Sequence, residues 1–476
     1  MKFNYIDEIL QKNKERFADH DYIFEKKDGE FRPHTYGEFY IAVRRVASFL
    51  QARGLKGKKI ALYLDDSYDY MVADIAITGY VGTGVCLSSQ WKTGDLKNII
   101  DEVDLDAILY EASKSVVVGE LKKSRPCVDY ISIEEMEASE PVAELEDWKV
   151  DETFCSKIVF SSGTTGSPKA VMLSQKNMFA NMENLLRRAP MNDSDICYLF
   201  LPLNHTYGGI CNFLYSVSTG MRIYLCSDKN LIMQEVAVVR PTVFCAVPIL
   251  FEKIYAYAKA NGVEVSKLLG GRIKYLFSGG AYLQSEIRKA FKKEKLNLLE
   301  AYGLSETTSL VSLEYSNSDD FESVGTVFEN IEVRIDSPDE NGVGEITVRG
   351  DNIFIGYYNR EELYLSSFDK DGYFRTGDLG CLRGDKLYLT GRKKRVIIRA
   401  NARNIYPEEI EAIIEENLRV EAVKVFDKNG CLHCTLFSDI LVDAQELMEK
   451  INALLPKYCR IEGCDILKNN LNTKLK

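Results

Sequence analysis

Short apolar runs alternate with amphipathic helical patterns over the first part of the chain. Phe39, Val43, Val46 and Leu50 recur at helical spacing, and Lys59–Leu64 is an apolar run of strand length. The same alternation continues with helices expected over Met71–Thr78 and Leu96–Glu102 and strands over Thr83–Leu87 and Ala107–Tyr110. Strands that alternate with helices predict a parallel sheet covered by helices, so the expected fold class is α/β, with layered αβ sheets.

The pattern changes toward the C-terminus. From about Gly344, Gly-punctuated strands over Gly344–Arg349 and Lys386–Leu389 predict an antiparallel β subdomain. A charged cluster follows at Arg392–Arg395. Beyond it we expect helices over Pro407–Asn417 and Ala444–Leu455 and strands over Ala422–Phe426 and Leu432–Phe437.

These patterns divide the chain into three parts. We expect a large N-terminal domain over residues 1–391, a hinge over 392–395 and a small mobile α+β domain over 396–476. Within the large domain, Cys127–Val150 is acidic and weakly periodic, so we expect it to be a surface connection.

Composition narrows the possible functions. The chain has 476 residues, of which 46% are apolar and 28% charged, as in folded proteins of two or three domains. The formal net charge of -11 disfavours nucleic acid as a partner. The most apolar stretch, Ile75–Leu87, contains glycines and threonines and is shorter than the ~18 residues of a spanning helix. The N-terminus has no apolar core of a secretory signal, so we expect a cytoplasmic protein without an integral membrane segment.

The 12 cysteines do not indicate a metal site or a disulfide framework. Cys86, Cys226, Cys245 and Cys381 lie in apolar runs, where a reduced thiol behaves as a small hydrophobic group. The CLHC sequence at Cys431–Cys434 is not followed by a second CxxC, so zinc is disfavoured and a plain strand is expected.

The most informative loop is Ser161–Lys169, with the sequence SSGTTGSPK between two apolar runs. Its glycines, hydroxyls and lysine could offer N–H, O–H and ammonium groups to phosphate oxygens. The loop is not a Walker loop, because Gly163 and Gly166 are too close and Lys169 follows Pro168. From composition alone, a Ser/Gly-rich surface turn remains an equal alternative.

Further segments follow this loop in order: PLNHTYG at Pro202–Gly208, AYGLSETT at Ala301–Thr308, YFRTGDLG at Tyr373–Gly380 and GRKKRVIIRANARNIYPEEIE from Gly391. With them the chain resembles the acyl-adenylating superfamily of AMP-forming enzymes. This family includes acyl-CoA and aryl-CoA synthetases, firefly luciferase and the adenylation domains of peptide synthetases. The resemblance extends from Thr35 to the C-terminus.

The resemblance implies ATP and Mg²⁺ as cofactors and assigns roles residue by residue. Glu306 is the expected magnesium ligand, since carboxylate oxygen suits this ion. Tyr302 is expected near adenine, Asp378 at the ribose and Arg392 at the ribose or phosphates. The full expected nucleotide-binding set is Ser161, Ser162, Gly163, Thr164, Thr165, Gly166, Lys169, Gly280, Ala281, Tyr302, Gly303, Thr307, Asp378 and Arg392.

The expected catalytic residues are Lys474, Glu306, His205 and Lys169. His205 matches the position that gates the acyl pocket, and we expect it to form a wall and gate and not to act as a general base. Lys474 matches the family's C-terminal lysine in LKNNLNTK, but the family's Pro and Gly are absent, so Lys476 and a frayed tail remain alternatives.

The resemblance also indicates the substrate class. Members that activate amino acids carry an Asp directly after the gate position, where this chain has Thr206, so an amino acid is disfavoured. The pocket is expected to be apolar and partly aromatic, for a fatty or aryl acid, and to include Tyr207, Gly208, Gly209, Gly279, Gly280, Ala281 and Tyr282.

The acyl acceptor stays open. In similar enzymes the small domain rotates about a hinge, here nearest Lys394, so that a thiol can attack the acyl adenylate. Acyl-CoA synthetases usually carry a Gly pair where this chain has Asn401 and Ala402, which puts CoA in doubt. An acid–CoA ligase is the first hypothesis. The alternatives are loading of a carrier-protein phosphopantetheine arm, release of the adenylate, and a catalytically silent acyl- or nucleotide-binding protein.

Overall fold

The computed structural model describes residues 5–138, 145–146, 148–161, 168–316, 318–398, 404–418, 420, 422–428, 431–437, 444–455 and 459–467. The chain forms two compact units. The first comprises Met1–Phe321, Gly325–Glu332 and Arg349–Gly372, and the second comprises Glu322–Val324, Val333–Val348 and Tyr373–Lys476.

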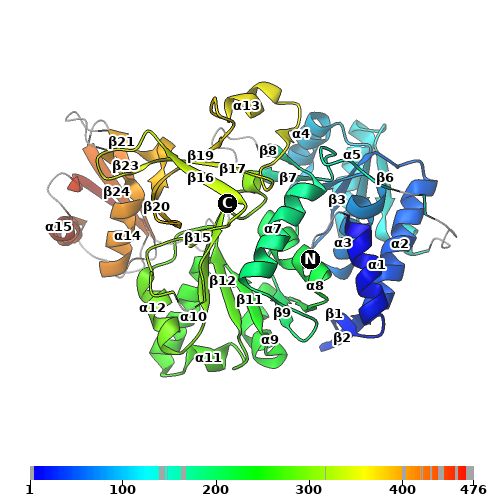
Figure 1. Ribbon diagram of the computed structural model, residues 1–476, viewed down its shortest axis with the longest axis horizontal. Coiled ribbons are helices and arrows are strands. Elements are labelled where there is room, and N and C mark those ends of the chain that lie inside the picture. Colours follow the sequence, from blue (N-terminus) through cyan, green and yellow to red (C-terminus); the bar gives the residue numbers. More distant parts are fainter. Residues whose placement is uncertain are drawn as a thin grey trace. The chain divides into compact units, whose positions relative to one another are not determined.

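One sheet of the first unit has the strand order β18-β8-β7-β4-β3-β5-β6 (Figure 1). Its strands are β3 (Lys59–Tyr63), β4 (Thr83–Cys86), β5 (Ala107–Tyr110), β6 (Asp129–Ser132), β7 (Lys157–Ser161), β8 (Lys169–Leu173) and β18 (Gly356–Tyr357). The pairs from β7 through β6 are parallel, whereas β7–β8 and β8–β18 are antiparallel. Buried residues of these strands pack with the helices after them, which confirms the predicted αβ layer.

A second sheet of the same unit has the order β15-β14-β13-β12-β11-β9-β10-β1-β2. Its strands are β1 (Asp21–Lys27), β2 (Glu30–Thr35), β9 (Ile196–Leu199), β10 (Arg222–Leu225), β11 (Val243–Ala246), β12 (Tyr275–Gly279), β13 (Leu298–Tyr302), β14 (Ser312–Leu313) and β15 (Thr326–Val327). Pairing is parallel from β1 to β13 and antiparallel at both ends.

The two faces of this second sheet have different partners, because side chains alternate along a strand. Tyr198, Phe244, Leu276 and Leu298 lie in one buried apolar cluster with residues of α9 to α12. Cys245 and Phe277, one position along, instead line a cavity. The strands therefore present one face to a packed core and the other to a possible binding site.

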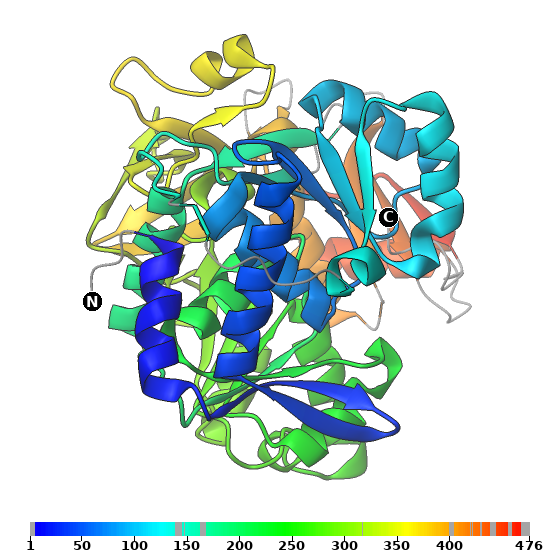
Figure 2. The same ribbon diagram turned by 90° about the vertical axis from the view of Figure 1, so that its right-hand side faces the viewer.

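The helices of the first unit are α1 (Ile6–Phe17), α2 (Tyr36–Ala52), α3 (Tyr68–Ala76), α4 (Thr93–Val103), α5 (Ser115–Ser124), α6 (Ile133–Glu137), α7 (Gln175–Arg188), α8 (Tyr215–Thr219), α9 (Ile232–Val239), α10 (Pro248–Asn261), α11 (Val265–Leu268), α12 (Ser285–Lys293) and α13 (Glu361–Ser366). Figure 2 shows α1 and α2 side by side, beside the β1–β2 hairpin. The short helices are π-type at η1 (Ile77–Val81) and η3 (Tyr207–Leu214) and 3₁₀-type at η2 (Ala112–Lys114), η4 (Lys229–Leu231) and η5 (Ser305–Thr307).

The second unit contains an antiparallel sheet in the order β16-β17-β19-β20. These strands are β16 (Ile331–Asp336), β17 (Gly344–Gly350), β19 (Phe374–Arg383) and β20 (Lys386–Arg392), and β16 and β17 have most of their residues in this unit. The 3₁₀ turn η6 (Lys393–Arg395) follows β20. The predicted antiparallel β region is confirmed, and β20 extends three residues beyond the predicted strand.

The C-terminal part of the second unit is a small α+β arrangement, as predicted. Its elements are β21 (Ile397–Ile398), β22 (Asn404–Ile405), α14 (Pro407–Asn417), β23 (Ala422–Lys428), β24 (Cys431–Phe437), α15 (Ala444–Leu454) and β25 (Gly463–Leu467). Strand β24 pairs antiparallel with β23 and parallel with β25. Ile410, Ile414 and Ile451 of the two helices pack with Val425 and Leu436 of the sheet.

The expectation for Cys127–Val150 is wrong in part. This segment contains β6, which adds a parallel edge strand next to β5, and α6, which begins at the N-cap Ser132. Tyr130 and Ile131 are buried. Four strand residues among many acidic ones leave a weak periodicity, so the strand is stabilised by its partner β5 and not by its own pattern.

Candidate active site

The two ends of the predicted phosphate loop lie side by side. Ser161 ends β7 and Lys169 begins β8, and the two residues are direct partners in the antiparallel register. The loop between them therefore starts and returns at one edge of the sheet. The predicted phosphate contacts of Ser162, Gly163, Thr164, Thr165 and Gly166 lie outside the described residues.

Glu306, in η5, is only 8% exposed, and two hydroxyls hold its carboxylate. The Tyr357 hydroxyl donates to Glu306 Oε1 at 2.8 Å, and Ser161 Oγ donates to the same oxygen at 3.3 Å. Within the described part of the chain, no hydrogen bond is recorded to Oε2. Among the described residues, Oε1 thus accepts two hydrogen bonds and Oε2 none, and a carboxylate held in this way fits a hard cation such as Mg²⁺.

Tyr357 also contacts Lys169. The Lys169 ammonium lies over the Tyr357 ring, 4.9 Å from its centroid. Burial, followed by the negative charge of Glu306, raises the pKa of Tyr357, so its hydroxyl stays protonated and can donate. Tyr357 thus lies between the predicted phosphate-binding lysine and the predicted magnesium ligand. We refer to Ser161, Lys169, Glu306 and Tyr357 as the polar cluster.

Sequence reasoning did not single out Tyr357. It lies on β18, which pairs with β8 through Tyr357 and Val171 although the two are far apart in the chain. The aromatic run around it, FIGYY at Phe354–Tyr358, could have indicated a strand. It could not have indicated which strand is its partner.

The turn that carries Glu306 is tightly packed. A Cβ on Gly303 would lie 2.0 Å from the Ser309 carbonyl oxygen, so only glycine fits there. The Thr307 hydroxyl is fully buried, and it accepts from the Leu304 N–H at 2.9 Å. Tyr302 is 7% exposed at the end of β13. Gly303 and Thr307 therefore shape this turn, and the predicted nucleotide contacts of these residues remain predictions.

The segment around His205 leads into the π-helix η3. Its glycines allow close packing, because a Cβ on Gly208 would lie 2.2 Å from the Pro202 carbonyl oxygen. The His205 side chain reaches solvent, but the protein around it removes part of its hydration, and this desolvation, together with the positive charge of Lys229, lowers its pKa. Thr206 is buried. The gate role of His205 remains a prediction.

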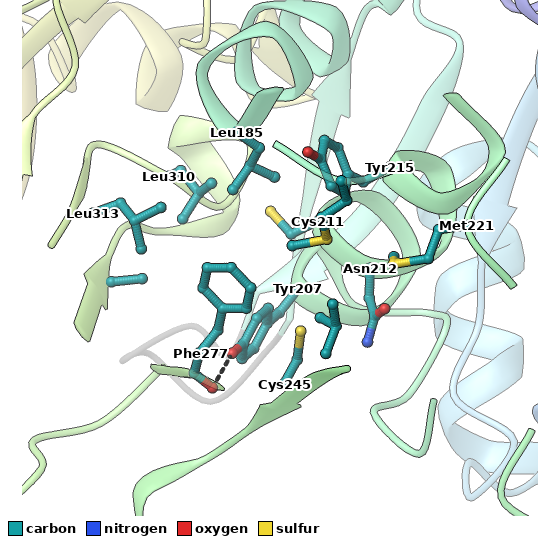
Figure 3. Close-up of a pocket in the computed structure, with 13 residues that line it drawn as sticks. Leu185, Tyr207, Cys211, Asn212, Tyr215, Met221, Cys245, Phe277, Leu310 and Leu313 are labelled. Atoms are coloured by element: carbon teal, nitrogen blue, oxygen red, sulfur yellow. Dashed lines mark hydrogen bonds between the residues drawn. The ribbon is translucent and has the colours of Figure 1, made fainter. Parts of the chain in front are cut away.

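An apolar cavity of about 20 Å³ lies between α7, η3 and the second sheet, with room for about one water molecule. Figure 3 shows its lining, which consists of Leu185, Met191, Tyr207, Cys211, Asn212, Tyr215, Met221, Val243, Cys245, Phe277, Ala301, Leu310 and Leu313. The Tyr207 hydroxyl donates to the Phe277 carbonyl oxygen at 2.9 Å. Ala301 directly precedes Tyr302, and Leu310 follows Glu306 by four residues, so the cavity shares its backbone with the nucleotide motif.

The expected pocket residues are distributed differently. Tyr207 lines the cavity, and a Cβ on Gly279 would lie 3.8 Å from its ring, so Gly279 leaves room beside Tyr207. Gly280, Ala281 and Tyr282 are exposed and are not among the lining residues. Gly280 has a φ of +85°, which favours glycine in this turn.

In the second unit, Asp378 and Arg392 are direct partners on β19 and β20. Arg392 Nε lies 2.8 Å from Asp378 Oδ1, and Asp378 is 5% exposed. Their ion pair brings a carboxylate and a guanidinium together, and the predicted ribose and phosphate contacts of these two residues remain predictions. Lys394, the predicted hinge residue, is exposed in η6. Asn401, Ala402, Lys474 and Lys476 lie outside the described residues.

The described residues contain neither a cluster of metal-ligating side chains nor a membrane-spanning helix. No group of three or more His, Cys, Asp or Glu side chains is placed to hold a metal ion there. Likewise, none of the described helices has the length and apolar character needed to cross a membrane.

Curated relatives align along most of the chain. The long-chain-fatty-acid–CoA ligase ACSBG2 of Rattus norvegicus is 24% identical, with 97% of this chain and 82% of that protein covered. The long-chain-fatty-acid–CoA ligase FadD15 of Mycobacterium tuberculosis is 25% identical, with 84% and 76% covered.

Solved structures share the fold. ATP-bound MatB from Rhodopseudomonas palustris has a TM-score of 0.85 at 22% identity, with 98% of this chain and 95% of that chain covered. The o-succinylbenzoate CoA synthetase MenE from Bacillus subtilis, in complex with its acyl-adenylate intermediate, has a TM-score of 0.82 at 23% identity, with 96% and 94% covered. Both comparisons confirm the predicted α/β architecture.

The family assignment comes from a direct match. Residues 10–358 match the family described as AMP-binding enzyme, and this span contains the predicted phosphate loop, the cavity and Glu306. Because the match covers well over half of the chain, the chain belongs to the family of AMP-binding enzymes.

Proposed function

We propose that this protein is an AMP-forming acid–CoA ligase. A carboxylate oxygen of the acid attacks the α-phosphorus of ATP, the bond to the β,γ-phosphates breaks, and pyrophosphate leaves. The thiol of CoA then attacks the acyl carbon of the adenylate and releases AMP. The observation that carries this proposal is the polar cluster beside the predicted phosphate loop, in a family of AMP-binding enzymes.

The polar cluster suits the first step. Two anions must approach each other, so charge has to be neutralised and the groups held in line. Lys169 supplies a cation, and Tyr357 and Ser161 orient the Glu306 carboxylate. Glu306 would hold Mg²⁺, which when bound offsets phosphate charge. A solved structure of MenE contains ATP and a magnesium ion, which supports ATP and Mg²⁺ here.

The cavity and the relatives support an apolar acid. Its lining is mainly Leu, Met, Phe, Val and Tyr side chains. The relatives ACSBG2 and FadD15 are both named long-chain-fatty-acid–CoA ligases, and MenE is named o-succinylbenzoate CoA synthetase. We propose a fatty or aryl acid as substrate, with amino acids disfavoured because Thr206 replaces the Asp expected in enzymes that activate them.

The remaining assignments extend this proposal. Asp378 and Arg392 bind the ribose and phosphate, Lys394 is the hinge between residues 1–391 and 396–476, and Lys474, or alternatively Lys476, contacts the reacting carboxylate. The alternative acceptor is a carrier protein in place of CoA. We also propose that the protein has no nucleic-acid partner and is cytoplasmic.

Acid-dependent exchange of labelled pyrophosphate into ATP tests the proposal. With a panel of fatty and aryl acids, at least one acid should support exchange without CoA, and added CoA should yield its thioester and AMP. If at least one acid supports exchange but none forms a thioester when CoA is added, the result would favour a carrier protein as the acyl acceptor. No exchange with any acid, under conditions where ATP still binds, would favour a silent nucleotide-binding protein.

A further inference from the structure

One polar side chain interrupts the apolar lining of the cavity. Asn212, in the π-helix η3, lines the cavity and is 1% exposed. Figure 3 shows its amide among apolar and sulfur-containing side chains from α7, η3 and the second sheet. A buried primary amide offers two N–H donors and needs acceptors for them.

The orientation of this amide is set by Cys197 on β9. The Cys197 thiol donates to Asn212 Oδ1 at 2.7 Å. Burial raises the pKa of Cys197 to about 12, so the thiol keeps its proton at neutral pH and remains a donor. Since Oδ1 accepts from the thiol, the nitrogen Nδ2 occupies the other position of the amide.

Nδ2 has no acceptor among the described residues. The two tyrosine hydroxyls of the lining, in contrast, each have an acceptor: Tyr207 donates to the Phe277 carbonyl oxygen and Tyr215 to the Ala189 carbonyl oxygen. Folded proteins leave few buried donors unpaired, since each costs free energy that water would have offset. Nδ2 itself is buried, so an unpaired donor on a lining residue becomes a candidate contact for a ligand once the side chains around it move.

The free volume is also informative. About 20 Å³ suffices for one water molecule or one small polar group. Any acyl tail would require the lining side chains to move, and a purely hydrocarbon tail would still leave Nδ2 unpaired. A tail that carries an oxygen would pair the donor.

We propose that Asn212 selects acids whose tail carries a hydrogen-bond acceptor, a carbonyl or hydroxyl oxygen, over acids with a purely hydrocarbon tail. The oxygen accepts from Asn212 Nδ2 inside the cavity, while the rest of the tail contacts apolar lining residues. This inference rests on the proposed function, because it takes the cavity to be the acyl pocket. It names the substrate class that the proposed function leaves open.

Matched acids test the selection on the wild-type chain. One series is octanoic acid with its 4-, 5-, 6- and 7-oxo derivatives, and the other is 3-phenylpropanoic acid with its 2-, 3- and 4-acetyl derivatives. We expect kcat/KM for pyrophosphate exchange to be about 10-fold or more higher for at least one oxo or acetyl acid than for its unsubstituted parent. Because no variant is involved, a folding failure cannot obscure this result.

Variants then assign the effect to Asn212. Asn212→Leu keeps the approximate volume but removes the donor, so the ratio of kcat/KM between the preferred oxo acid and its parent should fall to about one. Asn212→Asp, which keeps the shape and replaces Nδ2 by an acceptor, should also lose the ratio and serves if the leucine variant does not fold. Cys245→Ala changes the same lining without removing the donor, so the ratio should persist.

The outcomes separate this inference from the proposed function. If parent acids are activated as well as every oxo or acetyl derivative, the selection is wrong and a buried water pairs Nδ2, while the ligase assignment stands. A preference that survives in both Asn212 variants would also overturn it. If no acid supports exchange at all, the proposed function itself is wrong.

Discussion

The polar cluster and the apolar cavity are built in opposite ways: the cluster lies at β7, β8, β18 and η5, and the cavity between α7, η3 and the second sheet. In the polar cluster, Tyr357 and Ser161 both donate to one oxygen of Glu306, so the polar groups satisfy one another. In the cavity lining, the buried nitrogen of Asn212 has no acceptor among the residues that the structure describes. The comparison indicates that the cluster is preorganised before a ligand arrives, whereas our proposal for Asn212 has the cavity completed by its ligand.

The largest effect is expected from the polar cluster. Glu306→Gln keeps the shape but removes the charge that would hold Mg²⁺, so pyrophosphate exchange should fall by roughly 100-fold or more. The measurement is exchange as a function of Mg²⁺ concentration, with thermal unfolding as the control for folding. Exchange at the wild-type level would mean that Glu306 is not a metal ligand.

On the cavity side, Gly279→Ala should narrow the space beside Tyr207. The added Cβ would lie 3.3 Å from the Ala301 carbonyl oxygen and 3.8 Å from the Tyr207 ring. We expect kcat/KM for the larger acids to fall by about 10-fold, the scale of one methylene group in an apolar pocket, with KM for ATP unchanged. An equal loss for small and large acids would contradict the placement of Gly279 beside the acyl tail.

Tyr357→Phe tests whether the cluster is preorganised. The variant loses the hydrogen bond to Glu306 but keeps the ring under Lys169, so exchange should fall by about 10-fold. The matched control is Tyr358→Phe, whose hydroxyl donates to Asp104 Oδ2 at 3.2 Å at an exposed position. Similar losses in both variants would indicate a general effect of this strand and not a role in positioning Glu306.

The smallest effect concerns the core behind β13. Burial raises the pKa of Glu300 to about 8 from 4.5, although Arg288 lowers it. Between these two pH values the folded chain binds more protons than the unfolded chain, so the free energy of unfolding decreases as pH rises. The contribution of Glu300 to this slope is about 1 kcal/mol per pH unit, and Glu300→Gln should remove it.

Denaturant unfolding at pH 6 and pH 8 measures this effect, with the exposed Glu286→Gln on α12 as control. The wild type and the control should both lose stability over this interval, and Glu300→Gln should lose less. Parallel behaviour of all three would show that Glu300 titrates as an ordinary carboxyl.

The sequence predicted the polar cluster better than the cavity for a physical reason. Ser161, Lys169 and Glu306 lie in local runs whose glycine and hydroxyl chemistry can be recognised without the fold. Tyr357 could not be found in this way, because it reaches Glu306 only through the pairing of β18 with β8. Strands such as β5 were predicted with their exact bounds, since a fully buried strand is a continuous apolar run.

The cavity could not be predicted because its lining comes from separate elements. Leu185 is on α7, Asn212 on η3, Cys245 on β11 and Leu313 on β14, and each is an ordinary residue in its own segment. The glycine-rich turn at Gly280 looked like part of the pocket but is exposed. On the strands, the alternation of side chains decides which residues face the cavity, and the packing of α7 and η3 against the sheet supplies the rest of the lining.

Transfer of oxygen from acid to AMP tests the central claim most directly. The enzyme is incubated with ATP, Mg²⁺, CoA and the best acid of the panel, with ¹⁸O in both carboxylate oxygens. If the carboxylate attacks the α-phosphorus and CoA displaces AMP from the acyl carbon, one ¹⁸O must appear in the AMP phosphate for each thioester formed. Thioester formation with unlabelled AMP, or with ADP as the product, would contradict an acyl-adenylate intermediate and the account built on it.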